Sequence, residues 1–476
     1  MHSIIICPIC HSHFFERIPH MTDFENYMSP GRRGHLIGIG GVSMSSLAEV
    51  LYDMGLNISG SDTNESKNVI NLRNLGVPVY IGHKAGNIGD DIEFIVRTAA
   101  VHDDNPEVAE AIKKGIPVFE RTQAWGAISK DYNNALCIAG THGKTTTTSM
   151  CTHILMAADK DPTVMIGGTL PLLNAGHRIG RGNTIVMEAC EYYNSFLSLH
   201  PTVAVILNVE ADHLDFFHDL DEIKRSFRMF ASKVPEESGM IVVNGDDKNA
   251  LSCVEGLHRK VITFGLNPDA DVQAKNIHIN GTNTEFDIYY KNRFFTDVVL
   301  HVPGAHNVLN ALAATAASIC LGIRPTAVKY GLAGFNGAGR RFEFKGKFNG
   351  ADVYDDYAHH PGELKALLDT LETLNYKRTI VVFQPHTYTR TAALFDDFIE
   401  QLKRPDVLLL AEIFAAREIN TIGISSEDLA EHLPNSLFLP DFDALEEKLR
   451  EIASPGDVIF TVGAGDVYKL GERLFE

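Results

Sequence analysis

The sequence predicts an α/β protein made of three parallel-sheet domains in series. Short apolar runs of strand length alternate with helix-length segments from Gly34 to the end of the chain. A length of 476 residues corresponds to about three domains of ordinary size. We expect a flexible extension at residues 1–31, followed by domains at residues 32–131, 132–334 and 335–476.

The composition excludes several classes of protein. A net charge of −19 argues against a general nucleic-acid or membrane-surface role, because those partners require a basic surface. The apolar runs are far shorter than the ~20 residues that cross a bilayer. The seven cysteines lack the spacing of a disulfide framework. We therefore expect a cytoplasmic protein with reduced thiols that binds neither nucleic acid nor membrane.

The N-terminal extension has a different character from the rest of the chain. It carries a CxxC pair followed by three histidines: Cys7, Cys10, His11, His13 and His20. These side chains could supply four zinc ligands, but a single CxxC without a second half is weak evidence. A flexible tail is the preferred interpretation, and zinc binding is the alternative.

The first domain is predicted to begin with a strand, a glycine turn, a helix and a second strand, which is the start of a nucleotide-binding unit. Further short strands complete a parallel sheet. The segment His35–Gly41 is expected to hold the first strand and the glycine turn, and the expected helix is Met44–Met54. The other expected strands are Asn57–Asp62, Val77–Ile81, Phe94–Arg97 and Pro117–Glu120.

The glycine turn of this domain only partly matches a dinucleotide fingerprint. Gly38 and Gly40 occupy the first two glycine positions, but Ser43 stands at the third. Asp62 ends the following strand, where an acidic residue is typical. A dinucleotide cofactor is therefore poorly supported, and another diphosphate nucleotide remains open.

The second domain is predicted to open with a phosphate-binding loop. An apolar strand, Ala135–Ala139, runs directly into Gly140–Thr147, with the sequence GTHGKTTT. Glycines allow backbone N–H groups to surround an anion, Lys144 can reach outer phosphates, and the Thr145 hydroxyl can bind Mg²⁺. Ile138 replaces the first glycine of the usual pattern, which indicates a shortened loop. The expected ligand is ATP or GTP, and an ordinary strand-to-helix turn is the alternative.

Acidic and imidazole side chains follow two other strands of this domain. Because ligands bind at the carboxyl ends of strands in open α/β sheets, we predict Glu188 and His213 to be metal-site residues. Glu191, Glu210 and Asp215 are better explained as helix caps or surface acids. The strands expected beyond the loop are Thr184–Met187, Val203–Asn208 and Met240–Asn244.

A helix is expected from Asn307 to Leu321, with two asparagines in its first turn. Asn307 and Asn310 lie on one helix face, and paired amides can read an adenine edge. Capping of the helix by Asn307 is the competing explanation. The glycine-rich stretch Gly331–Gly339 is predicted to be a linker to the third domain.

The third domain again alternates strands and helices. The expected strands are Ala351–Tyr354, Thr379–Gln384, Asp406–Ala411 and Asp457–Val462, with helices starting at Pro361 and Thr391. An arginine from Arg340–Glu343 is suited to stabilising a transferring phosphoryl group from across a domain boundary. His359 and Arg390, which follow strands, could form a pocket for a carboxylate. A plain β–α loop is the alternative for the Arg390 segment.

Taken together, these motifs closely resemble those of the Mur ligases, in order, from about residue 33 to the C-terminus. The matching segments are Gly38–Met44, Gly140–Thr147, Glu210–His213, His306–Asn310, Arg340–Glu343, Asp355–Pro361 and Gln384–Arg390. The resemblance implies a Rossmann-like N-terminal domain, a P-loop ATPase central domain and a Rossmann-like C-terminal domain. It also implies an ATP-dependent, amide-bond-forming ligase of cytoplasmic cell-wall precursor synthesis.

Within the family, the pairing of DDYAHHP at Asp355–Pro361 with QPHTYTR at Gln384–Arg390 is similar to members that act on UDP-N-acetylmuramate. The resemblance implies that ATP phosphorylates the muramyl carboxylate and that the amine of L-alanine attacks the acyl phosphate. ATP and Mg²⁺ are the implied cofactors, and we expect a monomer or weak homodimer.

The resemblance also assigns roles to individual residues. The implied catalytic residues are Lys144, Glu188, His213, Arg341 and Asp356, with Thr145, Glu188 and His213 holding metal. The implied ATP site is Gly140, Thr141, His142, Gly143, Lys144, Thr145, Thr146, His306, Asn307 and Asn310. The implied substrate residues are Gly38, Gly40, Gly41, Met44 and Asp62 for the UDP-sugar, and His359 and Arg390 for alanine.

Three positions depart from the family pattern, namely Ser43, Cys190 and Thr387. Thr387 replaces a frequent second arginine, which leaves Arg390 alone for the alanine carboxylate. Three competing functions remain: the related ligase that attaches a recycled tripeptide, a nicotinamide-dependent oxidoreductase, and a non-catalytic nucleotide switch. The QPHTYTR segment argues against the tripeptide ligase, and Ser43 argues against the oxidoreductase. The convergence of several residues on one phosphate site argues against the switch.

Overall fold

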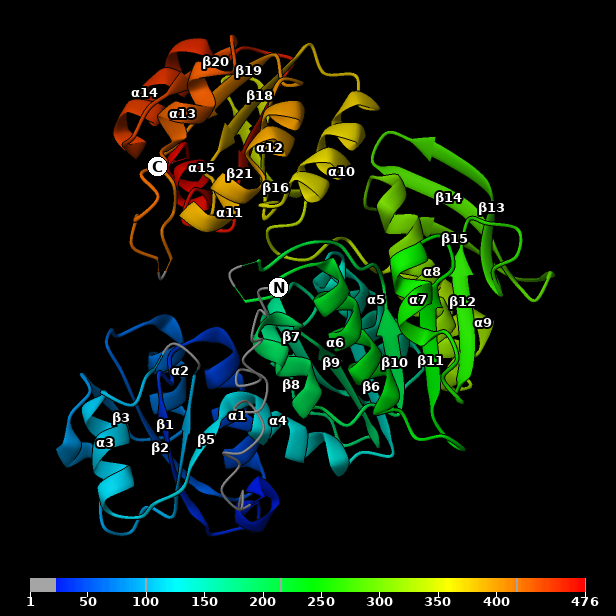
Figure 1. Ribbon diagram of the computed structural model, residues 1–476. Helices are drawn as coiled ribbons and strands as arrows, with labels where there is room; N and C mark the ends of the chain where they lie inside the picture. The colour runs from blue at the N-terminus through cyan, green and yellow to red at the C-terminus, as the bar shows by residue number, and fades with distance from the viewer. Residues whose placement is uncertain (1–22, 99–100, 215, 417, 476) are drawn as a thin grey trace, which may run out of the picture. The chain divides into compact units, whose positions relative to one another are not determined.

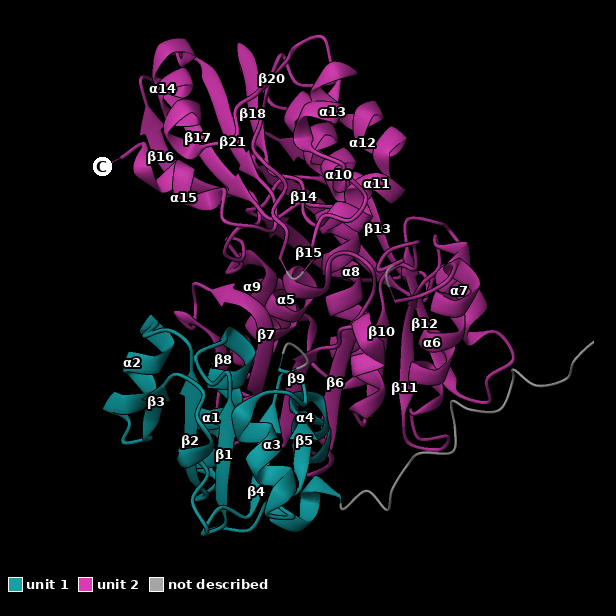
Figure 2. Cartoon of the chain, turned by 60° about the vertical axis from the view of Figure 1, so that its left-hand side comes forward, with its two compact units in different colours: residues 1–128 teal, residues 129–476 magenta. Residues whose placement is uncertain are grey.

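The computed structural model describes residues 23–98, 101–214, 216–416 and 418–475. The chain divides into two compact units, one ending at Ile128 and the other beginning at Ser129 (Figure 2). The candidate zinc ligands of the N-terminal extension and Asp215 lie outside the described residues. The predicted domain boundaries and the flexible tail stay predictions.

The first unit contains a parallel sheet with the strand order β3-β2-β1-β4-β5. Its strands are β1 (Arg33–Ile37), β2 (Asn57–Asp62), β3 (Val79–Ile81), β4 (Phe94–Arg97) and β5 (Val118–Glu120). Its helices are η1 (Phe24–Tyr27), α1 (Val42–Asp53), α2 (Lys67–Asn74), η2 (Ala85–Asn87), α3 (Pro106–Lys113) and α4 (Arg121–Lys130), which continues into the second unit. Every strand predicted for this domain is present. Strand β1 ends at Ile37, and the predicted glycine turn starts at Gly38.

The central sheet of the second unit has the order β15-β14-β13-β12-β11-β10-β6-β9-β7-β8 (Figure 1). Strand β6 (Asn134–Ala139), which leads into the phosphate loop, lies between β10 (Val203–Ile206) and β9 (Thr184–Glu188). Loops after these three neighbouring parallel strands therefore meet at one sheet edge. The remaining strands are β7 (Thr163–Leu170), β8 (Ala175–Arg178), β11 (Met240–Asn244), β12 (Lys260–Gly265), β13 (Val272–Asn280), β14 (Asn283–Tyr290) and β15 (Arg293–Leu300).

Helices of this region pack in two groups. The phosphate-loop helix α5 (Lys144–Ala157) packs against α8 (Ala305–Cys320) and α9 (Pro325–Ala333), while α6 (Leu220–Ser232) packs against α7 (Lys248–Val254). A short 3₁₀ segment, η3 (Tyr192–Ser198), follows β9. The alanine-rich face of α8 is buried in the central core, and the small side chains allow the helices to approach closely.

The predicted linker at Gly331–Gly339 is partly wrong. Gly331 lies inside α9, and a Cβ atom there would be 2.4 Å from Cα of Ile154 in α5. The glycine therefore permits close helix packing instead of chain flexibility, a distinction that glycine content alone does not reveal. The irregular connection begins after Gly334, which caps α9.

Replacing Gly331 by alanine is expected to lower the free energy of unfolding by about 1–3 kcal/mol, because the new methyl group must displace helix backbone. Urea denaturation of the second unit's transition measures this effect. Gly245→Ala, in the same unit, is the matched control, because a Cβ atom at Gly245 would be 3.5 Å or more from every neighbour, an ordinary contact distance. Equal stability of the two variants would contradict the assignment of Gly331 to helix packing.

The third sheet has the order β16-β17-β21-β18-β19-β20 and is parallel except for the β16–β17 pair. Its strands are β16 (Glu343–Phe348), β17 (Ala351–Asp356), β18 (Arg378–Phe383), β19 (Val407–Leu410), β20 (Ser436–Phe438) and β21 (Asp457–Val462). Its helices are α10 (Pro361–Glu372), α11 (Tyr388–Ala393), α12 (Phe395–Leu402), α13 (Ser426–Glu431), α14 (Phe442–Ile452) and α15 (Tyr468–Arg473). Helix α11 starts three residues before the predicted Thr391.

Across the described residues, no helix combines the length and the apolar character needed to cross a membrane.

Candidate active site

The phosphate loop has a backbone conformation that requires glycine. Gly143 caps α5 with a left-handed φ of 83°. A Cβ atom at this position would lie 2.6 Å from Oδ1 of Asn310. Any larger residue would therefore strain the backbone and collide with α8. The loop leads into the N-terminus of a 14-residue helix, which favours an anion.

Lys144 is held at this loop by its own backbone and by an acid. Its Nζ donates hydrogen bonds to the carbonyl oxygens of Gly140 (2.6 Å) and Thr141 (3.1 Å). It also pairs with the Glu191 carboxylate at 2.9 Å. Burial disfavours the charged amine, but Glu191 outweighs this effect and raises the pKa of Lys144. The interpretation of Glu191 as a surface or capping acid is therefore wrong, since its side chain is only 3% exposed and balances the lysine.

Glu188 ends β9 beside the start of α5. Its carboxylate accepts hydrogen bonds from the Thr145 hydroxyl (3.0 Å) and from the backbone N–H of Gly167 in β7 (2.8 Å). The structure thus brings together Thr145 and Glu188, the two residues that the motif analysis assigns to Mg²⁺.

His213 follows β10 and adopts a left-handed φ of 53°. Its Nε2 lies 3.8 Å from Glu191 and 3.7 Å from Asp212, and its ring stacks on Tyr192 with centroids 4.3 Å apart. Burial lowers the pKa of His213, so the imidazole is neutral and has a lone pair available for a ligand.

A cavity of about 250 Å³ adjoins the phosphate loop. It is lined by residues from the loop, from the start of α8 and from the third sheet's segments. The predicted site residues that line it are His142, Gly143, Thr145, Thr146, His306, Asn307, Asn310, Arg341 and Asp356. Motifs separated by more than 200 residues in sequence therefore converge on one cavity.

The two asparagines of α8 are engaged within the protein. Asn307 donates to the Pro303 carbonyl oxygen (2.6 Å), and Asn310 donates to Oδ1 of Asn307 (3.1 Å). The Oδ1 atom of Asn310 accepts from Thr147 in α5 (3.2 Å). Helix α8 is capped by Gly304, so the capping alternative for Asn307 is wrong. These bonds tie α8 to α5, and contact with adenine stays a prediction.

Two adjacent arginines have different environments. Arg341 lines the cavity, with its guanidinium 3.5 Å from Glu363 and 5.1 Å from the centre of the Tyr357 ring. Arg340 instead pairs with Asp355 (2.8 Å) and donates to the carbonyl oxygens of Gly463 and Gly465. Arg341 is therefore the residue placed to meet a ligand.

Asp356 lies at the end of β17 and also lines the cavity. Its carboxylate accepts backbone hydrogen bonds from Phe342 and Ala358, each 2.8 Å long. Burial raises the pKa of Asp356 to about 6, although Arg341 opposes the shift. The bond from Phe342 thereby holds the segment that connects the second and third sheets against the end of β17.

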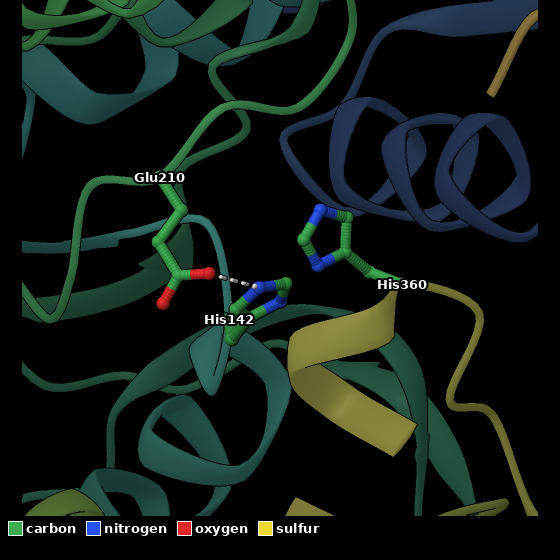
Figure 3. Close-up of side chains that lie close together, drawn as sticks. All are labelled: His142, Glu210 and His360. Atoms are coloured by element: carbon green, nitrogen blue, oxygen red, sulfur yellow. Dashed lines mark ion pairs between the residues drawn. The ribbon is translucent and has the colours of Figure 1, made fainter. Parts of the chain in front are cut away.

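His142 lies between two carboxylates. Its Nε2 is 3.4 Å from Glu210, and its Nδ1 is 3.4 Å from Glu363 of α10. Its ring also packs on His360, with centroids 4.8 Å apart (Figure 3). Burial alone would lower the pKa of His142, but the two carboxylates outweigh it and raise the pKa to about 9.

This imidazolium makes stability depend on pH. The folded pKa of about 9 exceeds the reference value of 6.5, so the stabilisation is complete below pH 6.5 and is lost as pH rises through 9. We expect a loss of at most about 3 kcal/mol in unfolding free energy between pH 6.5 and 9.5. Urea unfolding at both pH values should show a smaller loss in Glu210→Gln. The control is His432→Asn, which alters an exposed histidine and should lose as much unfolding free energy as the wild type. If Glu210→Gln also lost as much as the wild type, the prediction would be refuted.

The predicted carboxylate pocket contains an acid of its own. Nε and Nη2 of Arg390 donate to Oδ1 of Asp212 at 3.1 and 3.0 Å, and Nη1 lies 3.2 Å from Nδ1 of His386. Burial opposes ionisation of Asp212, but Arg390 outweighs it and lowers the pKa of this carboxyl. The pair borders a second cavity of about 130 Å³. Three of the five guanidinium N–H groups therefore already have partners.

His359 is placed near this pair. Its ring centroid lies 5.8 Å from that of His386, and its Nδ1 is 3.1 Å from Glu363. Burial lowers the pKa of His359 to about 4, so the ring is neutral. The structure thus groups His359 and Arg390 as predicted, while their binding of alanine stays a prediction.

The glycine turn that is predicted to bind the UDP-sugar belongs to the first unit. Gly38 has a left-handed φ of 78°, and the backbone N–H of Gly40 donates to Oδ2 of Asp62 (2.8 Å). The predicted ligand contact by Met44 cannot use its side chain, which is 1% exposed and belongs to the core. Ser43 accepts a hydrogen bond from Arg121. Asp62 therefore shapes the turn, and Gly41 begins α1 as its N-cap.

Comparison with known proteins gives three consecutive matches. The Mur ligase family catalytic domain matches residues 33–133, the Mur ligase middle domain matches residues 138–318, and the Mur ligase glutamate ligase domain matches residues 340–465. Together these matches span most of the chain. The chain belongs to the Mur ligase family.

Relatives of this Mur ligase are similar over nearly their whole length. The UDP-N-acetylmuramate–L-alanine ligase of Acetivibrio thermocellus is 46% identical, with 93% of this chain and 95% of that protein covered. The enzyme of the same name from Clostridium novyi is 43% identical, with 94% and 97% covered. The solved structure of UDP-N-acetylmuramate-alanine ligase from Thermotoga maritima has a TM-score of 0.79 at 27% identity and covers 93% of this chain and 98% of its own.

Sequence reasoning about this Mur ligase missed three acids that the structure places at the site. Glu191 holds Lys144, Glu363 contacts His142 and Arg341, and Asp212 pairs with Arg390. Asp212 and Glu363 each lie within or next to a recognised motif, and that position was the available signal. Glu210, interpreted as a surface acid, is exposed but pairs with His142.

Proposed function

We propose that this chain is an ATP-dependent ligase that joins L-alanine to the carboxylate of UDP-N-acetylmuramate in the cytoplasm, as a monomer or weak homodimer. The product is a precursor of peptidoglycan, on which cell shape and division depend. The observation that carries the proposal is the cavity where the phosphate loop meets Arg341 and Asp356. The names of the similar full-length relatives support the choice of substrates.

The phosphate loop supplies charge and alignment for the first step. Backbone N–H groups at the start of α5 can bind an anion, and the partly buried, cationic Lys144 is already held at the loop. Transfer of the terminal phosphoryl group of ATP to the muramyl carboxylate concentrates negative charge there. Lys144 and Arg341 stabilise that charge from two sides of the site.

Glu188 at the end of β9 and Thr145 in α5 fit a hard divalent cation. The Thr145 hydroxyl and the Glu188 carboxylate are 3.0 Å apart, and such oxygen donors are those that Mg²⁺ prefers. When bound, Mg²⁺ neutralises charge on the phosphate oxygens. The neutral ring of His213 provides a further donor near Glu191.

The second step requires the amine of L-alanine close to the acyl phosphate. We assign the alanine carboxylate to Arg390, which borders the second cavity and lies beside His386, whose ring is near that of His359. Neutral His359 can accept a hydrogen bond from the incoming amine. The amine then attacks the acyl carbon, and phosphate leaves.

The glycine turn of the first unit, shaped by Asp62, binds the UDP diphosphate through backbone N–H groups.

Phosphate release by the purified chain tests this function. The assay contains ATP, Mg²⁺ and UDP-N-acetylmuramate, with L-alanine present or omitted. Release that depends on L-alanine is the expected result. Release with the tripeptide but not with L-alanine would instead identify the recycling ligase, and no release with either amine would favour the nucleotide switch.

A further inference from the structure

Three potential metal ligands meet beside the phosphate loop. His142 comes from the loop, Glu210 follows β10, and His360 caps the N-terminus of α10 (Figure 3). One ligand atom from each of these residues lies within 4.8 Å of the other two. The first two belong to the part of the chain around the central sheet, and the third belongs to the part around the third sheet.

The space between these atoms is kept open by a glycine. A Cβ atom at Gly362 would lie 3.1 Å from Oε2 of Glu210, 3.4 Å from Nε2 of His142 and 3.4 Å from Nδ1 of His360. A side chain at position 362 would therefore crowd all three ligand atoms. Tetrahedral zinc ligands, at about 2.0–2.2 Å from the metal, are about 3.4 Å from one another, so the three side chains must move closer together when the ion binds.

One of the three atoms is also a buried nitrogen with an unmet hydrogen bond. Nε2 of His142 is inaccessible to solvent and makes no hydrogen bond with any residue that the structure describes, although it is 3.4 Å from Glu210. The His360 residue is 6% exposed. A zinc ion at this point would take the place of the Nε2 proton that faces the Glu210 carboxylate, and the proton would be released to solvent.

The opposite ring nitrogens have the partners that metal-binding histidines use. Nδ1 of His142 is 3.4 Å from the buried carboxylate of Glu363, and Nε2 of His360 is 3.3 Å from the carbonyl oxygen of Ala211. A carboxylate or carbonyl at the second nitrogen fixes the ring and strengthens the first nitrogen as a ligand. The lone pair of His360 Nδ1 accepts the Gly362 N–H at 3.2 Å, and zinc binding would replace this capping hydrogen bond.

From this geometry we propose that His142, Glu210 and His360 bind one divalent transition-metal ion of the Zn²⁺ class. Two imidazoles and one carboxylate favour Zn²⁺ or Co²⁺ over Mg²⁺, which prefers oxygen donors. The site is therefore distinct from the Thr145–Glu188 site and does not depend on the proposed ligase activity. Glu210 is largely exposed, which leaves room for a water as the fourth ligand. The ion would connect the phosphate loop to α10.

Calorimetric titration of the full chain with ZnCl₂ tests the site. The titration is done at pH 8 without nucleotide and with excess Mg²⁺, in a Cys7→Ser, Cys10→Ser background that removes the other candidate zinc ligands. This background protein is expected to bind one zinc ion at the site. Gly362→Ala, which keeps all three ligands but adds a methyl group against them, should weaken that binding by about 10- to 100-fold.

A second variant separates the ligand from the helix cap. His360→Asn removes the imidazole while asparagine retains a capping oxygen for α10, so it should also lose this zinc. His432→Asn, at an exposed helix end, should bind zinc as the background does. Undiminished zinc binding in both Gly362→Ala and His360→Asn would overturn the proposal.

Anomalous diffraction from zinc-soaked crystals of the background protein provides a readout that needs no variant at the site. A zinc peak within bonding distance of the three ligand atoms supports the proposal. A peak elsewhere only, or no peak, overturns it.

Discussion

Lys144→Ala is expected to lower alanine-dependent phosphate release by roughly 10³-fold, since one positioned charge at a phosphoryl-transfer site contributes about this much. The lysine Nζ lies on the loop carbonyls and beside Glu191, so its charge is fixed where the phosphates would bind. Alanine removes that charge without altering the glycines of the loop. Steady-state rates at saturating ATP measure the loss directly.

The controls separate charge from stability. Lys144→Ala leaves Glu191 buried without its partner, which lowers stability, and a second change, Glu191→Gln, should restore the melting temperature without restoring the rate. Lys160→Ala, on the exposed surface, should leave the rate unchanged. A Lys144→Ala rate within tenfold of the wild type would show that the loop is not the phosphate site.

Arg341→Ala is expected to reduce the rate by a similar factor, about 10³-fold, while the fold stays intact. The guanidinium lines the cavity, and its described ion pair is a 3.5 Å contact with Glu363. Its loss removes positive charge from the wall of the cavity that the phosphate loop also lines. The rate constant at saturating substrates, measured with a thermal melt of the same sample, gives both quantities.

The neighbouring arginine is the matched control. Arg340 holds Asp355 and two backbone carbonyl oxygens, so Arg340→Ala should mainly lower the melting temperature. Arg341→Ala should thus lose rate and keep its melting temperature, whereas Arg340→Ala should mainly lose melting temperature. If Arg341→Ala has a lowered melting temperature but retains its rate per folded molecule, Arg341 is a structural residue. Its assignment to phosphoryl transfer would then fail.

The sequence was sufficient to place motifs at strand ends. Apolar runs such as Leu136–Ala139 mark strands buried on both faces, and the loops that follow parallel neighbours must meet. This is why Thr145 and Glu188 could be grouped in advance, whereas adding Arg341 and Asp356 from the third sheet required the resemblance to the Mur ligases. The exposed outer half of β13 has no such run, and the antiparallel β13–β15 extension was accordingly missed.

Side-chain pairing was less accessible to sequence reasoning. Acids after a strand can be solvated or turned inward, and the choice depends on which cation the fold brings near. Glu191 is buried because Lys144 lies beside it, and Glu363 is buried because His142 and Arg341 arrive from distant segments. The asparagines of α8 likewise bond each other and Thr147, a result that helical spacing does not predict.

The buried ion pair between Asp212 and Arg390 determines which solutes can loosen that contact. Both side chains are about nine-tenths buried, so dissolved salt screens them far less than it screens surface pairs. Raising the ionic strength should leave the contact closed. A small molecule with a carboxylate that fits the adjoining cavity, however, can replace Asp212 on the guanidinium. The contact therefore responds to the shape of an anion and not to the concentration of ions in the surrounding solution.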